Sequence, residues 1–174
     1  MRILYIDIDS LRPDHLGCYG YARDTSPAID GIAADGIILE QVYSSDVPCL
    51  PSRSTFFGGV FGMKTGLVNH GGSNADPRQE GASRGFQSRA VSRSFGEQLR
   101  NLGFCVASIS SFPHRHSAYH VWNGFTETID PGGDGLGHAH ETHAHAKRWL
   151  DANGAEDDWF LHVNFWDPHT PYDT

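Results

Sequence analysis

The pentapeptide Cys49-Leu50-Pro51-Ser52-Arg53 combines a potential nucleophile with a potential anion-binding group. A proline in the first turn of a helix costs no hydrogen bond, so the sequence predicts a helix that begins near Pro51. Cys49 would then lie at the positive end of the helix dipole, where an anion is stabilised. Arg53 follows one turn later and could direct its guanidinium at the same anion. A free cysteine is, however, more often a small buried hydrophobic residue than a nucleophile.

Two further segments carry polar side chains at the end of an apolar run. Asp9 ends the first run, and His169 follows the last one in Asp167-Pro168-His169. A carboxylate at the end of a strand can bind a divalent metal or cap the following turn. Asp7 shares the face of Asp9 deeper in the strand and is the weaker ligand candidate. A loop histidine is usually solvated, but it can also donate to an anion or deliver a proton near neutral pH.

Apolar runs and turn residues indicate strands that alternate with helices along the chain. Strands are expected at 2–9, 37–43, 104–110 and 159–166, and helices at 27–36, 51–59, 94–102 and 138–150. Residues 62–90, rich in Gly, Ser and Arg, are expected to form a long loop, and residues 113–137 are expected to be irregular. This alternation predicts an α/β fold in which a mostly parallel sheet has helices on both faces.

The candidate side chains are expected to gather at one edge of that sheet. Ligands of parallel α/β sheets bind beyond the carboxyl ends of the strands. Those ends carry Asp9, Ser110-Ser111 and Asp167-Pro168-His169, and Cys49 comes shortly after the expected strand 37–43. The position of these residues therefore favours a common site, whatever its chemistry.

The pentapeptide, the stretch 8–20 and the stretch 166–172 resemble the signatures of the type I sulfatases of the alkaline phosphatase superfamily. The resemblance spans residues 3–173 and implies the N-terminal part of an alkaline-phosphatase-like sulfatase core. It implies that a formylglycine-generating enzyme oxidises Cys49 to formylglycine (3-oxoalanine). It also implies that Asp9 and residue 49 bind Ca²⁺ or another divalent metal, and that Cys49, Arg53 and His169 are catalytic.

The chain departs from the family pattern at two places. A second acid often follows the first in this family, whereas Ser10 follows Asp9 here. Many members also carry a Gly-Lys-Trp-His segment after the third strand, and this chain has no lysine in residues 110–116. Three histidines are candidates to bind the substrate in its place: His70, His114 and His116.

The resemblance implies hydrolysis of a small-molecule or carbohydrate sulfate ester by the formylglycine hydrate. One hydroxyl of the hydrate would attack sulfur, and the other would expel sulfate and restore the aldehyde. A phosphonate monoester or phosphodiester hydrolase of the same superfamily stays open, because such enzymes also lack the Gly-Lys-Trp-His segment. The interpretation as an inactive truncated fragment also stays open. Because calcium takes about six to eight oxygen ligands, we expect further ligands beyond Thr174 and no activity from this portion alone.

A histidine-rich tract offers a second possible metal site. On a helix, His138, Glu141 and His145 would share one face. An exposed helix that carries histidines by composition is the favoured interpretation, because Trp149 and Leu150 indicate ordinary core packing.

Composition narrows the remaining function classes. The 174 residues suffice for one domain, and the net charge of −8 argues against non-specific binding to nucleic acid. The cysteines at 18, 49 and 105 have no paired metal spacing and indicate no disulfide framework. No signal peptide or membrane-spanning run is visible, so we expect a cytoplasmic protein without membrane contact, unless the sequence has been trimmed.

Overall fold

The computed structural model describes residues 1–71, 75 and 94–170 of the chain. It divides into two compact units, one formed by Met1–Asp9 with Ser45–Thr174 and the other by Ser10–Ser44. The larger unit contains the sheet and every candidate site residue. Within the described residues, none of the helices has both the length and the apolar character needed to cross a membrane.

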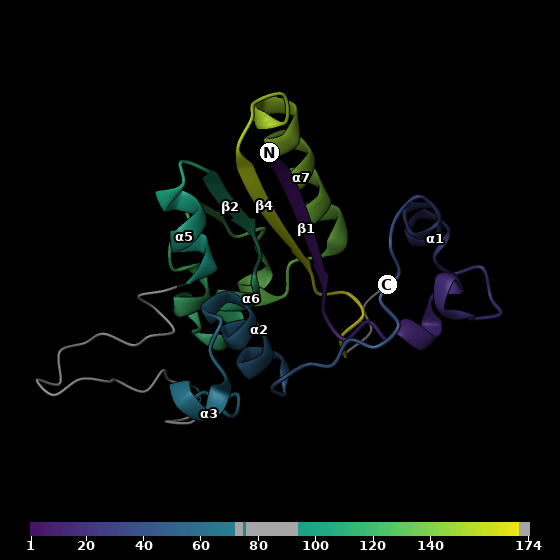
Figure 1. The fold of residues 1–174 in the computed structure, drawn as a ribbon, viewed down its shortest axis with the longest axis horizontal. Helices are drawn as coiled ribbons and strands as arrows, with labels where there is room; N and C mark the ends of the chain where they lie inside the picture. The colour runs from purple at the N-terminus through teal and green to yellow at the C-terminus, as the bar shows by residue number, and fades with distance from the viewer. Residues whose placement is uncertain (72–74, 76–93, 171–174) are drawn as a thin grey trace, which may run out of the picture. The chain divides into compact units, whose positions relative to one another are not determined.

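A four-stranded parallel sheet forms the centre of the larger unit, in the strand order β1-β4-β2-β3 (Figure 1). The strands are β1 (Arg2–Ile8), β2 (Cys105–Ile109), β3 (Glu127–Ile129) and β4 (Trp159–Phe165). The α-helices of the described chain are α1 (Pro27–Asp35), α2 (Cys49–Gly58), α3 (Gly62–Thr65), α5 (Phe95–Asn101), α6 (Phe112–His116) and α7 (Ala139–Asn153). Short 3₁₀ turns are η1 (Pro13–His15), η2 (Gly17–Tyr19), η4 (Tyr119–Trp122) and η5 (Gly133–Gly135).

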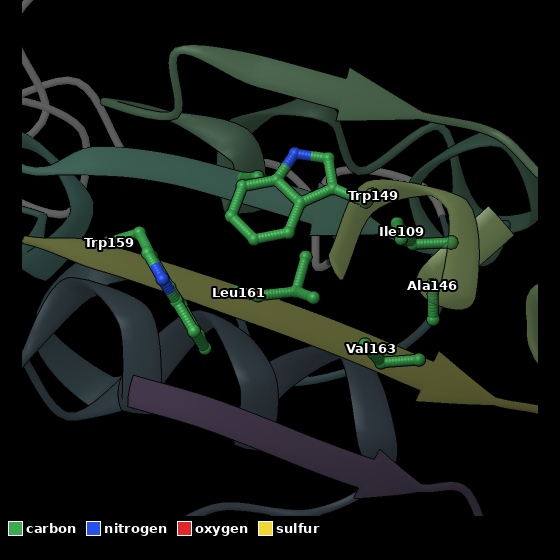
Figure 2. Packing of buried hydrophobic residues seen from close by; sticks show 7 residues of the cluster. Ile109, Ala146, Trp149, Trp159, Leu161 and Val163 are labelled. Carbon is green, nitrogen blue, oxygen red and sulfur yellow. The ribbon is translucent and has the colours of Figure 1, made fainter. Parts of the chain in front are cut away.

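One face of the sheet packs against α7. Side chains alternate between the two faces of a strand, so Trp159 and Leu161 of β4 point to the same side. There they meet Ala146 and Trp149 of α7, which form one hydrophobic cluster with them (Figure 2). The Trp149 and Trp159 rings meet edge to face with centroids 5.5 Å apart. Trp149 and Leu150 thus pack in the core, as predicted, whereas His138, His140 and His143 are exposed.

The opposite face of the sheet is covered by α2 and α5. The ring of Phe160 in β4 meets that of Phe95 in α5 edge to face, with centroids 4.7 Å apart. The His162 ring likewise meets the Phe57 ring of α2 edge to face, with centroids 5.2 Å apart. Tyr5 of β1 adds to the same aromatic layer, 6.5 Å from Phe57. Helices therefore cover both faces, which confirms the predicted α/β fold.

Two predictions about the elements are wrong. Residues 37–43 form no strand, and Ile37 and Tyr43 are 88% and 84% exposed. A β-branched run becomes a strand only where another strand pairs with it, and the described unit Ser10–Ser44 contains none. Conversely, residues 113–137, which are expected to be irregular, contain β3. This three-residue strand is too short to show an alternation of apolar and polar side chains. The expected loop 62–90 begins with α3, and most of its remainder lies outside the described residues.

The first strand is less buried than predicted. β1 is the last strand on its side of the described sheet, so Leu4 and Ile6 are 46% and 47% exposed. β4, by contrast, lies between two neighbours and is buried through Asn164. The sequence of β1 is apolar enough for either position, so its place in the sheet could not be read from composition.

A carboxylate organises the smaller unit. Asp30 of α1 accepts hydrogen bonds from the Cys18 amide at 2.7 Å and from the Ser26 hydroxyl at 3.0 Å. A Cβ atom on Gly17 would lie 2.3 Å from an Asp30 oxygen, so a larger residue would displace the Asp30 side chain. The half-buried acid thereby fixes the turn that precedes the predicted helix.

The two-sided core makes a quantitative prediction for Leu161, whose side chain is fully buried. Leu161→Ala should lower the free energy of unfolding by about 2–5 kcal/mol, because it removes buried methyl groups and leaves a cavity. Leu102→Ala, at a position 73% exposed, should change it by less than about 0.5 kcal/mol. Urea denaturation measures both values. Equal effects of the two substitutions would contradict the described core.

Candidate active site

The helix that carries Cys49 begins at Cys49 itself, two residues before the expected start. Pro51 is its third residue, where the missing N–H has no acceptor within the helix in any case. The ten-residue helix ends at Gly58, and Gly59 adopts a left-handed backbone with φ of 62°. Cys49 therefore lies at the N-terminus of α2, as predicted, and Arg53 follows one turn later.

Hydrogen bonds from Arg53 link α2 to the carboxyl end of β1. Its Nε and Nη2 atoms donate to the two carboxylate oxygens of Asp7 at 2.6 and 2.8 Å. Its Nη1 atom donates to Asp9 at 2.9 Å. Arg53 and Asp9 are 9% and 3% exposed, so these charges lie largely out of water. Because two hydrogen bonds join Arg53 to the two oxygens of Asp7, this contact is directional as well as stabilising.

Asp7 and Arg53 hold each other in the charged form. Burial raises the pKa of Asp7, but hydrogen bonds from His162 and Arg53 outweigh it and hold that pKa far below its ordinary value. Burial likewise opposes the charge of Arg53, but Asp7 and Asp9 hold its pKa above the ordinary value. Both oxygens of Asp7 accept from Arg53, so Asp7 positions the arginine.

Two imidazoles lie against the Cys49 thiol. The Sγ atom is 3.1 Å from His70 Nε2 and 3.9 Å from His116 Nε2, and the two rings lie 4.8 Å apart. Burial, and then the charge of Asp9, raise the pKa of the Cys49 thiol, so it is protonated at neutral pH. Burial and the nearby Arg115 lower the pKa of His116 to about 4, and burial lowers that of His70. Both imidazoles are therefore neutral at pH 7.

Arg115 is a site residue that the sequence analysis missed. It lies in α6 directly after β2, where its Nη1 atom donates to the Gly135 carbonyl at 2.5 Å. Its side chain is 11% exposed, and its buried Nη2 atom has no hydrogen-bond partner among the described residues. That atom lies 3.6 Å from the Asp9 carboxylate. Burial lowers the pKa of Arg115 to about 10, which leaves it charged at pH 7.

The signal for Arg115 was present in the sequence. The stretch 110–116 lacks the lysine of the family pattern but contains this other cation, between the two histidines that were considered. A guanidinium can bind an anion as a lysine can, with a more directed set of donors. In the sequence analysis, only histidines are candidates to replace the lysine.

The remaining predicted histidines differ in their relation to Cys49. The His169 ring stacks on Trp166 at 3.7 Å, and Trp166 also lies 3.3 Å from the Arg115 guanidinium. His169 thus borders the cluster through Trp166. His114 Nδ1 instead lies 3.0 Å from a carboxylate oxygen of Asp130. Within the described residues, Cys49 Sγ contacts the imidazoles of His70 and His116 and not that of His114.

Among the described residues near Cys49, Asp9 is the candidate ligand for a hard metal ion such as calcium. Asp9 has the hard oxygen donors that calcium prefers and lies close enough for its charge to act on the Cys49 thiol. Calcium needs about six to eight oxygens, however, and Asp7 is already engaged by Arg53. Most ligands of such an ion would have to come from other groups.

Solved structures share the fold of this chain. The chain superposes on a putative sulfatase from Bacteroides thetaiotaomicron with a TM-score of 0.74 at 17% identity, over 97% of this chain and 35% of that one. It superposes on the phosphonate monoester hydrolase of Agrobacterium radiobacter with a TM-score of 0.70 at 19% identity, over 99% of this chain and 42% of that one. The fold is that of the alkaline phosphatase superfamily.

Sequence comparison identifies the family within this superfamily. The family model described as Sulfatase matches residues 2–174, so the chain belongs to the sulfatase family. It is 39% identical over 61 residues to the ulvan-active sulfatase of Formosa agariphila, covering 34% of this chain and 12% of that protein. It is 37% identical over 70 residues to the steryl-sulfatase of Rattus norvegicus, covering 40% of this chain and 12% of that protein. The matched part is thus a small share of each relative.

The Arg53 contact makes a prediction for stability. Asp7→Asn should lower the free energy of unfolding by about 3–5 kcal/mol at pH 7, because it leaves a buried arginine without its paired carboxylate. Asp151→Asn is the matched control, since Asp151 pairs with Lys147 on the exposed face of α7. An exposed pair of this spacing contributes about 0.3–0.5 kcal/mol. Chemical denaturation of the two variants measures the difference.

The same contact should weaken in acid. The folded pKa of Asp7 lies below the ordinary value of about 3.9, so its stabilisation is complete above that pH. As the pH falls below about 3.9, the unfolded chain takes up the proton first and the stabilisation is lost. The difference in stability between wild type and Asp7→Asn should therefore shrink from pH 7 to pH 3. A difference that is constant over this range would contradict the buried ion pair.

Proposed function

We propose that this chain contributes the nucleophile and part of the anion-binding site of a sulfuric ester hydrolase. Membership of the sulfatase family supports the reaction class. The observation that carries the proposal is the position of Cys49, at a helix N-terminus beside a buried cation and the carboxyl end of β1. In a sulfate ester, this environment would favour the charge that develops on oxygen in the transition state.

The proposal includes formylglycine at position 49 and a divalent metal, with Ca²⁺ as the expected ion. Formylglycine would supply a hydroxyl nucleophile in its hydrated form, and the metal, held in part by Asp9 and residue 49, would polarise the sulfate. The formylglycine-generating enzyme is the implied partner. The remaining ligands would come from parts of the protein beyond this chain, which matches only a small share of its relatives.

The residues of this chain would position the ester and balance its charge. Arg53 is held on two sides by Asp7 and Asp9, so its charge near residue 49 is fixed before substrate binds. Arg115 would bind a sulfate oxygen through its buried Nη2 atom. His70 and His116 would offer hydrogen bonds without added charge.

His169 would assist the leaving oxygen as proton donor, which suits an imidazole near neutral pH. His114 is the weaker of the histidine candidates, because Asp130 already pairs with it. Trp166 contacts both His169 and Arg115, so it would keep the proton donor and the anion-binding group in one arrangement.

The organic part of the substrate is proposed only as a small-molecule or carbohydrate group. Two relatives of similar identity are named for different materials, ulvan and a sterol. Both names share the sulfate ester, and the sulfate is the part of the substrate that Arg53 and Arg115 would contact.

Turnover by the full-length protein tests the proposal. Co-produced with a formylglycine-generating enzyme and supplied with Ca²⁺, it should hydrolyse an aryl sulfate faster than an aryl phosphonate. Cys49→Ala should lower the rate by at least about 10³-fold, since it removes the nucleophile. Cys105→Ser changes an exposed cysteine and should leave the rate unchanged. Faster hydrolysis of the phosphonate would favour the phosphonate monoester hydrolase alternative, and hydrolysis of neither ester would contradict both.

Arg115 has its own test in the same assay. Arg115→Gln should lower kcat/KM for the sulfate ester by about 10²–10³-fold, as loss of a transition-state anion donor does. Arg115→Lys should recover part of this loss, because it restores the charge without the guanidinium geometry. Arg148→Gln, on the exposed side of α7, is the matched control and should have no effect. Full activity of Arg115→Gln would show that Arg115 does not bind the sulfate.

A further inference from the structure

The cysteine that the proposed function would convert to an aldehyde also belongs to a group of metal-binding side chains. In the part of the chain that the structure describes, one group of three His, Cys, Asp or Glu residues has ligand atoms within 4.8 Å of one another. It consists of Cys49, His70 and His116. Its donors are one sulfur and two imidazole nitrogens, a different chemistry from the oxygen ligands of calcium.

The distances suit a tetrahedral ion. A zinc ion lies about 2.3 Å from a thiolate sulfur and about 2.0–2.1 Å from an imidazole nitrogen, which places sulfur and nitrogen about 3.5 Å apart in a tetrahedral site. The Cys49 sulfur lies 3.1 Å from His70 Nε2 and 3.9 Å from His116 Nε2. The two values lie on either side of the tetrahedral one, and all three ligand atoms lie within 4.8 Å of one another.

We propose that the chain with an unmodified Cys49 binds Zn²⁺ through Cys49, His70 and His116. Thiolate and imidazole ligands favour zinc over calcium, so the chemical state of residue 49 would decide which metal the site accepts. Binding forms a sulfur–zinc bond and releases the thiol proton to solvent, without a change of oxidation state. Three protein ligands leave the fourth position for water or an anion.

The charges around Cys49, His70 and His116 are compatible with zinc binding. Arg115 Nε donates to His116 Nε2 at 3.3 Å, so zinc would replace that hydrogen bond. Arg115 would keep its bond to the Gly135 carbonyl and its place 3.6 Å from Asp9. The negative charges of Asp9 and of the thiolate formed on binding would offset the added ion. Conversion of Cys49 to formylglycine would remove the sulfur and with it the preference for zinc.

Cobalt substitution tests the site without any assay of turnover. The full chain, produced without a formylglycine-generating enzyme and with its Cys49 thiol verified by mass, is titrated with Co²⁺. We expect one ion per chain, with thiolate-to-cobalt charge-transfer absorption and the visible bands of a tetrahedral ion. Zn²⁺ should displace it. Cys49→Ser should abolish the charge-transfer band, and His70→Ala and His116→Ala should each weaken binding at least about tenfold.

Matched variants separate this site from other thiols and histidines. Cys105→Ser changes an exposed thiol and His143→Ala an exposed histidine of α7, and both should keep the band. Circular dichroism shows whether each variant is folded. A charge-transfer band that survives in Cys49→Ser, or no band in the folded wild type, would overturn the proposal. The test uses the thiol form, so its failure would leave the hydrolase proposal intact, and inactivity of the modified enzyme would leave the zinc site intact.

Discussion

The contact of Arg53 with Asp7 and Asp9 determines the geometry of the site. Arg53 and Asp9 are buried here and the Asp7 side chain is 15% exposed, and removing such charges from water is costly unless each finds its partners. Arg53 fills both oxygens of Asp7 and one of Asp9, so α2 can dock on the sheet in one orientation only. That orientation places the N-terminus of α2, with Cys49, beside the carboxyl end of β1.

The parallel sheet then brings the other groups to the same edge. β2 leads into α6, which carries Arg115 and His116, and β4 leads to Trp166 and His169. Because all strands point the same way, their following residues converge, although they are far apart in the sequence. The site thus combines a fixed buried ion pair with neutral imidazoles and one arginine whose Nη2 atom is unsatisfied among the described residues. This combination suits an anionic ester, and the same sulfur and imidazoles suit a soft metal.

Local patterns predicted the parts of the site that have a local cause. The helix at Cys49 and Arg53 follows from a short motif, and the place of Asp9 follows from the end of an apolar run. The failures depend on distant partners: within the described residues, the run 37–43 has no neighbouring strand, and β1 lies at the end of the described sheet because of the strand order. The contact of His70 with Cys49 joins residues 21 positions apart, which no periodicity reveals.

The chemical state of Cys49 is the most direct measure of the proposed function. The full-length protein, produced together with a formylglycine-generating enzyme, is digested and the Cys49 peptide is analysed by mass spectrometry. The account predicts a peptide whose thiol has been replaced by an aldehyde, lighter than the cysteine form and reactive with a hydrazine. A peptide that keeps its intact thiol under these conditions would contradict the assignment of Cys49 as the precursor of the nucleophile.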